Sequence, residues 1–291
     1  AGATLLDDTR AVKINVSRGK AVSAEVVHQA TGERYEIRAK NILLACGALS
    51  TPHILLASGI DKEIPAGELV GRFLMRHANG VVSGIAAKKT NPGNVFHKQV
   101  AVSDYYFGDP EKKKMPSGTW GLIQEIHTPG KGVMKANVPF GLKNIAAFMS
   151  EFLLNLLCIA EDVPQYANRV YIDISIKDAF GMPALRVYHR YAKRDIEARN
   201  ALYGVAKKIL LAAGALPVYC FHINTFSHAI GTCRFGDNAA TSVLDPECRV
   251  WGVKNLFVLD GSFMPSGGSV NPSLTIAANS LRVAKILTAR S

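Results

Sequence analysis

The first part of the chain alternates apolar and polar residues and then changes to a continuous apolar run. Three alternating stretches, AVKINV, AVSAEVV and RYEIRA, are separated by short turns, which is typical of an antiparallel meander with one solvated face. The run at 40–47, KNILLACG, is apolar in its centre and predicts a buried central strand. Residues 48–60 then predict a helix, capped by Ser50 or Thr51 and ended by Gly59.

The middle of the chain predicts a second sheet with helices packed against it, an α+β layer. Its apolar segment Ile145–Ala160 is interrupted by Glu151 and Asn155 and is short for a membrane span. We predict an amphipathic helix there, as a core or lid element, with docking to a membrane or a partner as the alternative. Residues 193–215 have the apolar spacing of another helix. The predicted strands are residues 81–87, 98–107, 119–127, 169–175 and 184–190.

The end of the chain returns to the order expected of an α/β unit. The apolar strand Asn255–Gly261 is followed by a loop rich in Gly and Ser, and then by a helix over 273–289. The predicted fold class is therefore α/β combined with α+β. We place the boundaries of its three segments at residues 1–78, 79–221 and 222–291.

The positive charge of the chain does not by itself indicate nucleic-acid binding. The 291 residues are 48% hydrophobic and 20% charged, which is globular, with a formal net charge of +11. Lys and Arg are scattered, and their densest runs, at 111–115 and 189–199, form no basic face interleaved with aromatic residues. We therefore expect no nucleic-acid partner. The charge would attract an anionic cofactor or balance an acidic segment outside this chain.

The cysteines and the first residues of the chain give information on the cellular compartment of the protein. Five cysteines, far apart and without a C-x-x-C pair, argue against a zinc site and against a disulfide framework. The chain starts without Met and shows no signal or transit peptide, so we expect a fragment or a processed piece. We expect a soluble protein with no membrane association, and both the cytoplasm and the periplasm stay open.

Two positions near the C-terminus could contact a ligand. Asp260 ends a buried strand, where carboxylates accept hydroxyls of ribose or ribitol in dinucleotide folds, although Asp-Gly is also a common turn pair. Asn271 and Pro272 open the last helix. The free N–H groups of Ser273 and Leu274 could therefore face a partially negative atom, such as a flavin carbonyl, and plain helix capping is the alternative.

His228 lies in the stretch SHAIGTCRFG, just before a Gly-Thr-Cys turn. A structural imidazole is the ordinary reading of such a histidine. A metal site lacks partners, because the nearest histidine is His222 and no H-E-x-x-H motif occurs. A serine hydrolase lacks G-x-S-x-G. A general base remains, because the free pKa of histidine lies near neutrality.

Several stretches together resemble the glucose-methanol-choline (GMC) family of flavin oxidoreductases. They are GALSTPHILLASGI, SHAIGTCRFG and the segment from TSVLDPECR to SLRVAKIL, with weaker matches in ELVGRFLMRHANG and EDVPQYANRVYIDISIKDAFGMPALRV. The N-terminal G-x-G-x-x-G segment of the family has no counterpart, so the resemblance is to its C-terminal part. Arg76 also stands where the family leads us to expect an acidic residue before His77.

The resemblance implies FAD as the cofactor. It implies a partial FAD-binding Rossmann-like domain from residues 1–78 and 222–291, the latter also carrying the active site, and an antiparallel-sheet substrate-binding domain from residues 79–221. The cofactor-binding residues that it implies are Ala45, Gly47, Asp260, Gly261, Asn271, Pro272, Ser273 and Leu274.

The resemblance also implies a reaction and its catalytic residues. His228 would take the proton of an alcohol or sugar hydroxyl while hydride passes to flavin N5, and Asn271 would hold the oxygen. The electron acceptor, which could be oxygen, a quinone or a cytochrome, stays open. Two alternatives also stay open: an inactive fragment or subunit that needs an N-terminal FAD-binding partner, and a lyase of the family without redox turnover.

Overall fold

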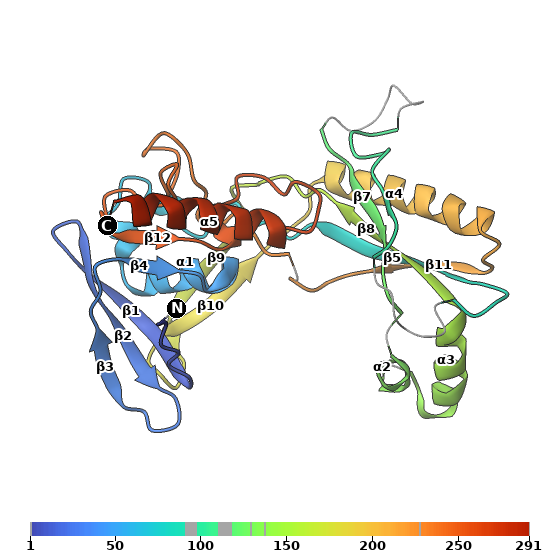
Figure 1. The fold of residues 1–291 in the computed structure, drawn as a ribbon, viewed down its shortest axis with the longest axis horizontal. Helices are drawn as coiled ribbons and strands as arrows, with labels where there is room; N and C mark the ends of the chain where they lie inside the picture. The colour runs from blue at the N-terminus through green and yellow to red at the C-terminus, as the bar shows by residue number, and fades with distance from the viewer. Residues whose placement is uncertain are drawn as a thin grey trace.

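The chain folds into two lobes in the computed structural model (Figure 1). The structure describes residues 2–90, 98–109, 118–128, 130–136, 138–226 and 228–290. The predicted basic run at 111–115 lies outside the described residues. Among the helices that the structure describes, none is long and apolar enough to cross a bilayer.

The first lobe begins with the predicted meander. Its strands pair antiparallel in chain order: β1 (Thr9–Ser17), β2 (Lys20–His28) and β3 (Arg34–Ile37). The buried strand that follows, β4 (Ile42–Leu44), pairs in parallel with β12 (Leu256–Val258) from near the other end of the chain. The two ends of the chain therefore build one unit, as the α/β part of the prediction requires.

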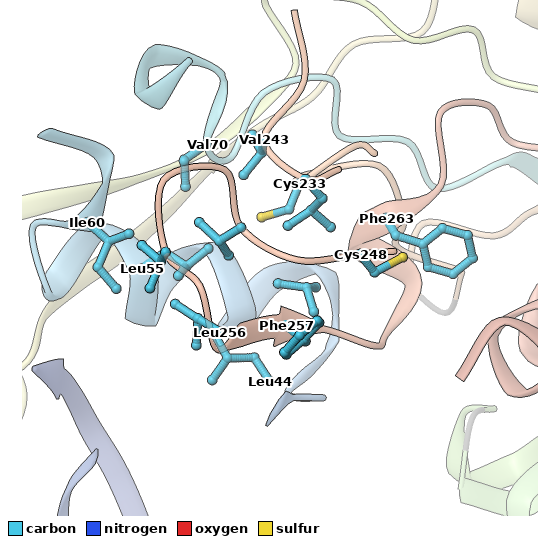
Figure 2. Close-up of a cluster of buried hydrophobic side chains, with 14 of the residues drawn as sticks. Leu44, Leu55, Ile60, Val70, Cys233, Val243, Cys248, Leu256, Phe257 and Phe263 are labelled. Atoms are coloured by element: carbon cyan, nitrogen blue, oxygen red, sulfur yellow. The ribbon is translucent and has the colours of Figure 1, made fainter. Parts of the chain in front are cut away.

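Each strand of this parallel pair is followed in the chain by a helix. Helix α1 (Gly47–Ala57) follows β4 directly, and α5 (Ser273–Ala289) follows β12 through a loop and the short 3-10 helix η5 (Gly261–Phe263). Figure 2 shows the apolar core of this lobe, with side chains from α1, β4 and β12 gathered together. Its fully buried members include Leu55, Leu244 and Leu256. Two further 3-10 turns, η1 (Ile60–Lys62) and η2 (Gly67–Leu69), follow α1 in the chain.

The second lobe is built on a five-stranded antiparallel sheet. Its order is β11-β5-β8-β7-β6, with β5 (Ala78–Ile85), β6 (Ala101–Val102), β7 (Gly121–Glu125), β8 (Leu153–Ala160) and β11 (Val218–His222). Helix α4 (Lys193–Ala212) lies along one face of this sheet (Figure 1), and its buried Leu202 and Leu210 share a core with Val82 and Trp120. This sheet with its helix is the predicted α+β layer, so the predicted fold class is confirmed.

The single helix predicted for Ile145–Ala160 is wrong. The helical part, α3 (Lys143–Met149), ends before the 3-10 turn η4 (Ser150–Phe152), and the apolar run after it is the strand β8. Both edges of β8 are paired, with β5 on one side and β7 on the other. A short apolar run fits a central strand as well as a buried helix, and here the pairing on both sides decides for the strand.

The remaining elements lie outside these two sheets. A hairpin of β9 (Arg169–Lys177) and β10 (Pro183–Tyr188) packs against α1, where Nε2 of His53 lies 2.7 Å from the carbonyl oxygen of Pro183. The short helix α2 (Lys131–Ala136) and the 3-10 turn η3 (Phe140–Leu142) precede α3. The strand predicted for 98–107 is shorter than expected, since only β6 pairs.

Candidate active site

The segment that carries His228 is held between two others by backbone hydrogen bonds. Ile230 and Met75 exchange N–H donors and carbonyl acceptors at 2.9 and 3.0 Å. One residue further on, the N–H of Gly231 donates to the carbonyl of Gly261 at 3.0 Å. His228 therefore lies where the start of the five-stranded lobe meets the end of the parallel strand β12.

Two glycines in this junction leave no room for a side chain. Gly231 has φ of +94°, and a Cβ there would lie 2.6 Å from the carbonyl oxygen of Phe73. A Cβ on Gly261 would lie 2.9 Å from Ile230 and 3.3 Å from Ile276 on the first turn of α5. The close approach of the His228 segment, β12 and α5 thus depends on glycine at both positions.

A second histidine contacts His228. Nδ1 of His77 lies 3.0 Å from Nδ1 of His228, and the two rings meet edge to face with centroids 5.1 Å apart. Nδ2 of Asn79 lies 3.4 Å from the same nitrogen of His228. Burial, followed by the nearby His77 and Lys98, lowers the pKa of His228 to about 4, so its imidazole is neutral at physiological pH. A neutral imidazole can accept a proton.

His77 is itself held in one orientation. It is 1% exposed, and its Nε2 lies 2.8 Å from the carbonyl oxygen of Gly267. Its φ of +60° is a conformation that a residue with a Cβ adopts at a cost, and such residues gather at functional sites. Burial lowers the pKa of His77, and the carbonyl of Gly267 and the charge of Asp162 oppose that change.

An acidic residue from another part of the chain contacts position 76. Asp162, 1% exposed, accepts a hydrogen bond from the backbone N–H of Arg76 at 3.2 Å and lies 2.6 Å from Nε2 of His189. The guanidinium of Arg76 has other partners than Asp162. It donates to the carbonyl of Asn224 at 3.0 Å and lies over the ring of Phe226, two residues before His228.

Asp260 lies at the end of β12, as predicted, but protein donors already surround its carboxylate. It is 6% exposed and accepts from the N–H of Gly47 at 3.0 Å and the hydroxyl of Thr51 at 2.5 Å. Its other oxygen accepts from the N–H and the hydroxyl of Ser262 at 2.8 and 2.5 Å. Asp260 thus joins the start of α1 to the end of β12, a role that the sequence did not reveal.

The other predicted cofactor residues lie at the ends of the same elements. Ala45 is exposed at the carboxyl end of β4, and Gly47 follows it as the first residue of α1. Pro272 precedes α5, whose first turn has no side-chain cap, and Ser273 and Leu274 are exposed, Leu274 to 82%. The first lobe therefore has exposed helix N–H groups at the start of α5, and exposed apolar atoms there and at the carboxyl end of β4.

The loop between η5 and α5 connects this end of the first lobe to the second lobe. The hydroxyl of Tyr106 donates to the carbonyl of Gly268 at 2.7 Å, and the hydroxyls of Thr119 and Ser269 lie 3.2 Å apart. Asn271 follows in the same loop and is partly buried. The described contacts do not join Asn271 directly to His228, so its catalytic role stays a prediction.

Sequence reasoning missed three contributors to the site: His77 as a partner of His228, Asn79 beside it, and the carbonyl of Gly267. The stretch LMRHANG, which contains two of them, was the available signal, since it forms part of a weaker family match. No cluster of three or more metal-ligating side chains occurs within the ranges that the structure describes.

The two lobes meet at the segment of His228, close to the end of the parallel strand β12 and to the uncapped helix α5. Family models described as GMC oxidoreductase match residues 1–102 and residues 164–280. The chain belongs to the GMC oxidoreductase family. FAD is the cofactor of this family.

The comparisons with single proteins agree with this assignment. The chain is 31% identical to a 2-methyl-1,2-propanediol dehydrogenase of Mycolicibacterium austroafricanum, over 99% of this chain and 55% of the relative. It is 30% identical to a 6'''-hydroxyparomomycin C oxidase of Streptomyces lividus, over 96% of this chain and 50% of the relative. A formate oxidase structure from Aspergillus oryzae RIB40 shares the fold, with a TM-score of 0.69, 16% identity, and coverage of 97% of this chain and 60% of that one. The chain thus spans about half the length of the curated relatives it matches.

Proposed function

We propose that the protein is an FAD-dependent oxidoreductase that acts on a CH–OH group of a small alcohol or sugar, with His228 as the base. The observation that carries the proposal is the partly buried imidazole of His228, on a segment whose Gly231 N–H donates to the carbonyl of Gly261 after the end of β12. Burial lowers the pKa of this imidazole to about 4, so it is neutral at physiological pH. The relatives support the substrate class, because their names include a propanediol dehydrogenase and a 6'''-hydroxyparomomycin C oxidase.

The residues at this end of the first lobe fit FAD. The uncapped N–H groups of Ser273 and Leu274 suit a partially negative carbonyl, because the helix dipole places positive charge there. Ala45 and Leu274 offer exposed apolar atoms that a flat ring system would cover. When bound, FAD supplies the two-electron acceptor to which the hydride of the alcohol carbon passes.

The protein's own part in the reaction is to hold the alcohol and to take its proton. His228 receives the hydroxyl proton at a ring nitrogen, which its neutral state allows. Asn271, in the loop anchored by Gly267 and Gly268, holds the same oxygen through its amide. Asp260 acts indirectly, since it fixes the start of α1 against the end of β12.

The pKa of His228 predicts how the reaction depends on pH. Because burial lowers this pKa to about 4, the base stays unprotonated well below neutrality. Flavin reduction by a saturating alcohol should therefore hold its rate from neutral pH down to about one unit above that value and fall below it. Anaerobic stopped-flow absorbance across this range measures the profile. A midpoint at the ordinary pKa of histidine would contradict the assignment of His228 as a buried neutral base.

A further inference from the structure

We infer that His77 is a positioning residue that fixes which nitrogen of His228 carries the hydrogen, so that Nε2 of His228 is the atom left free to take a proton. The inference rests on the proposed function, in which His228 is the base. It follows from a chain of hydrogen-bonding groups. The carbonyl of Gly267 contacts the ring of His77, and the ring of His77 contacts the ring of His228.

The carbonyl of Gly267 determines which nitrogen of His77 carries the hydrogen. Nε2 of His77 lies 2.8 Å from the carbonyl oxygen of Gly267, which can only accept. Nε2 must therefore carry the hydrogen and donate it. Because burial disfavours the charged ring, His77 is neutral and has one N–H only. Its Nδ1 is then a bare acceptor.

His77 in turn determines which nitrogen of His228 carries the hydrogen. Nδ1 of His228 lies 3.0 Å from Nδ1 of His77, and two bare nitrogens at that distance would repel each other. Since His77 offers only a lone pair there, Nδ1 of His228 must carry the hydrogen. A neutral imidazole with hydrogen on Nδ1 has its lone pair on Nε2. The partner of the other ring nitrogen thus sets the tautomer of the base, as it does for metal-bound histidines.

Among the described residues, Asn79 is the one group besides His77 with a hydrogen-bond contact to Nδ1 of His228. Its Nδ2 lies 3.4 Å away and would favour a lone pair on that nitrogen, but the contact is longer than that of His77, and Oδ1 of Asn79 is buried without a partner. A carboxamide has nearly the same shape when turned end for end. With Oδ1 toward His228, Asn79 becomes a second acceptor for the same N–H.

The charges around the pair are compatible with two neutral rings. The charges of Asp162 and Glu161 favour the protonated form of His77, while the charge of Lys98 opposes protonation of His228. Burial is nevertheless the largest influence on both rings, and it favours the neutral form of each. The backbone of His77, at φ of +60°, holds its ring between the two partners.

The tautomer can be measured directly by nitrogen NMR. Protein labelled with 15N-histidine is studied at neutral pH without substrate, and the His228→Ala variant identifies the signals of His228. We expect Nδ1 of His228 to be the protonated nitrogen and Nε2 to be unprotonated. A hydrogen on Nε2 of His228 would overturn the inference, whatever the activity of the protein.

Two variants of His77 then separate positioning from packing. His77→Gln keeps an acceptor and a donor on one planar group, whereas His77→Leu removes both. We expect His77→Leu to lose the single tautomer of His228 and to reduce its flavin about 10- to 100-fold more slowly, a loss typical of a missing orienting partner. His77→Gln should recover most of the rate and keep the tautomer. If His77→Gln is folded and keeps the wild-type tautomer but is as slow as His77→Leu, the inference fails.

Failure of the proposed function would look different. If His228→Ala reduces its flavin at the wild-type rate, His228 is not the base, but the tautomer in the wild-type protein still tests the link to His77. If His228→Ala is inactive while His77→Leu keeps both the single Nδ1–H tautomer and the wild-type rate, the base assignment stands and the role of His77 is wrong. Should His77→Leu not fold, the wild-type tautomer and His77→Gln still decide.

Discussion

His228→Ala should lower the rate at which an alcohol reduces the bound flavin by at least about a hundredfold, because general-base catalysis by a positioned side chain contributes that much or more. The flavin content should stay near that of the wild-type protein. The backbone of the His228 segment is held by Met75 and Gly261 rather than by its imidazole, so the site should keep its shape. Rapid-mixing absorbance under anaerobic conditions measures the rate.

A matched control removes the nearest histidine along the chain. His222 ends β11, is exposed, and lies 2.9 Å from the hydroxyl of Tyr203, with no contact to His228 among the described residues. His222→Ala should therefore reduce its flavin at close to the wild-type rate. Equal losses in the two variants would indicate a general disturbance of the second lobe and would contradict a specific role for His228.

Asp260→Ala should lower the free energy of unfolding by at least about 3 kcal/mol. The substitution removes the acceptor of the buried hydroxyls of Thr51 and Ser262, of the buried N–H of Ser262 and of the partly buried N–H of Gly47, and each unsatisfied buried donor costs about 1–3 kcal/mol. It also removes a negative charge from the start of α1, where the helix dipole favours one. Urea unfolding followed by circular dichroism measures the change.

Asp260→Asn is the control for this effect. An amide keeps the shape and one acceptor oxygen but turns the other acceptor into a donor, so we expect an intermediate loss of stability. A protein with Asp260→Ala that unfolds at the wild-type urea concentration would show that the carboxylate does not join α1 to β12.

The start of α1 shows what the sequence could not predict. Ser50 or Thr51 was the expected cap, yet the helix begins at Gly47 and its first N–H donates to Asp260. Thr51 lies inside the helix and donates to the same carboxylate. A cap supplied from a distant part of the chain leaves no local signal, whereas Gly59, with a φ of +74° just after the helix, marks its end as predicted.

The error at β8 has a different origin. The helix over 143–149 and the strand over 153–160 adjoin with only a three-residue turn between them, so the sequence reads as one apolar segment. Periodicity cannot separate a buried strand from a buried helix over so few residues. The meander and the last helix, by contrast, have clear patterns of alternation and helical spacing, and their predicted positions agree with the structure.

The candidate site was predictable only in part. His228 and the cofactor residues lie in stretches that resemble a family, and the family is confirmed. The pairing of His228 with His77 depends on a left-handed backbone conformation and on the carbonyl of Gly267, both of which arise from tertiary structure. The position of Asp162 opposite Arg76 likewise arises from the antiparallel second lobe rather than from a local motif.

Anaerobic mixing of the FAD-loaded protein with a panel of alcohols and sugars shows directly whether the protein oxidises a CH–OH group. If the protein oxidises a CH–OH group, at least one compound should bleach the flavin absorbance bands and yield the matching carbonyl product in equal amount. A protein that binds FAD but whose flavin stays oxidised with every compound, while a substrate is cleaved without redox change, would contradict the assignment as an oxidoreductase.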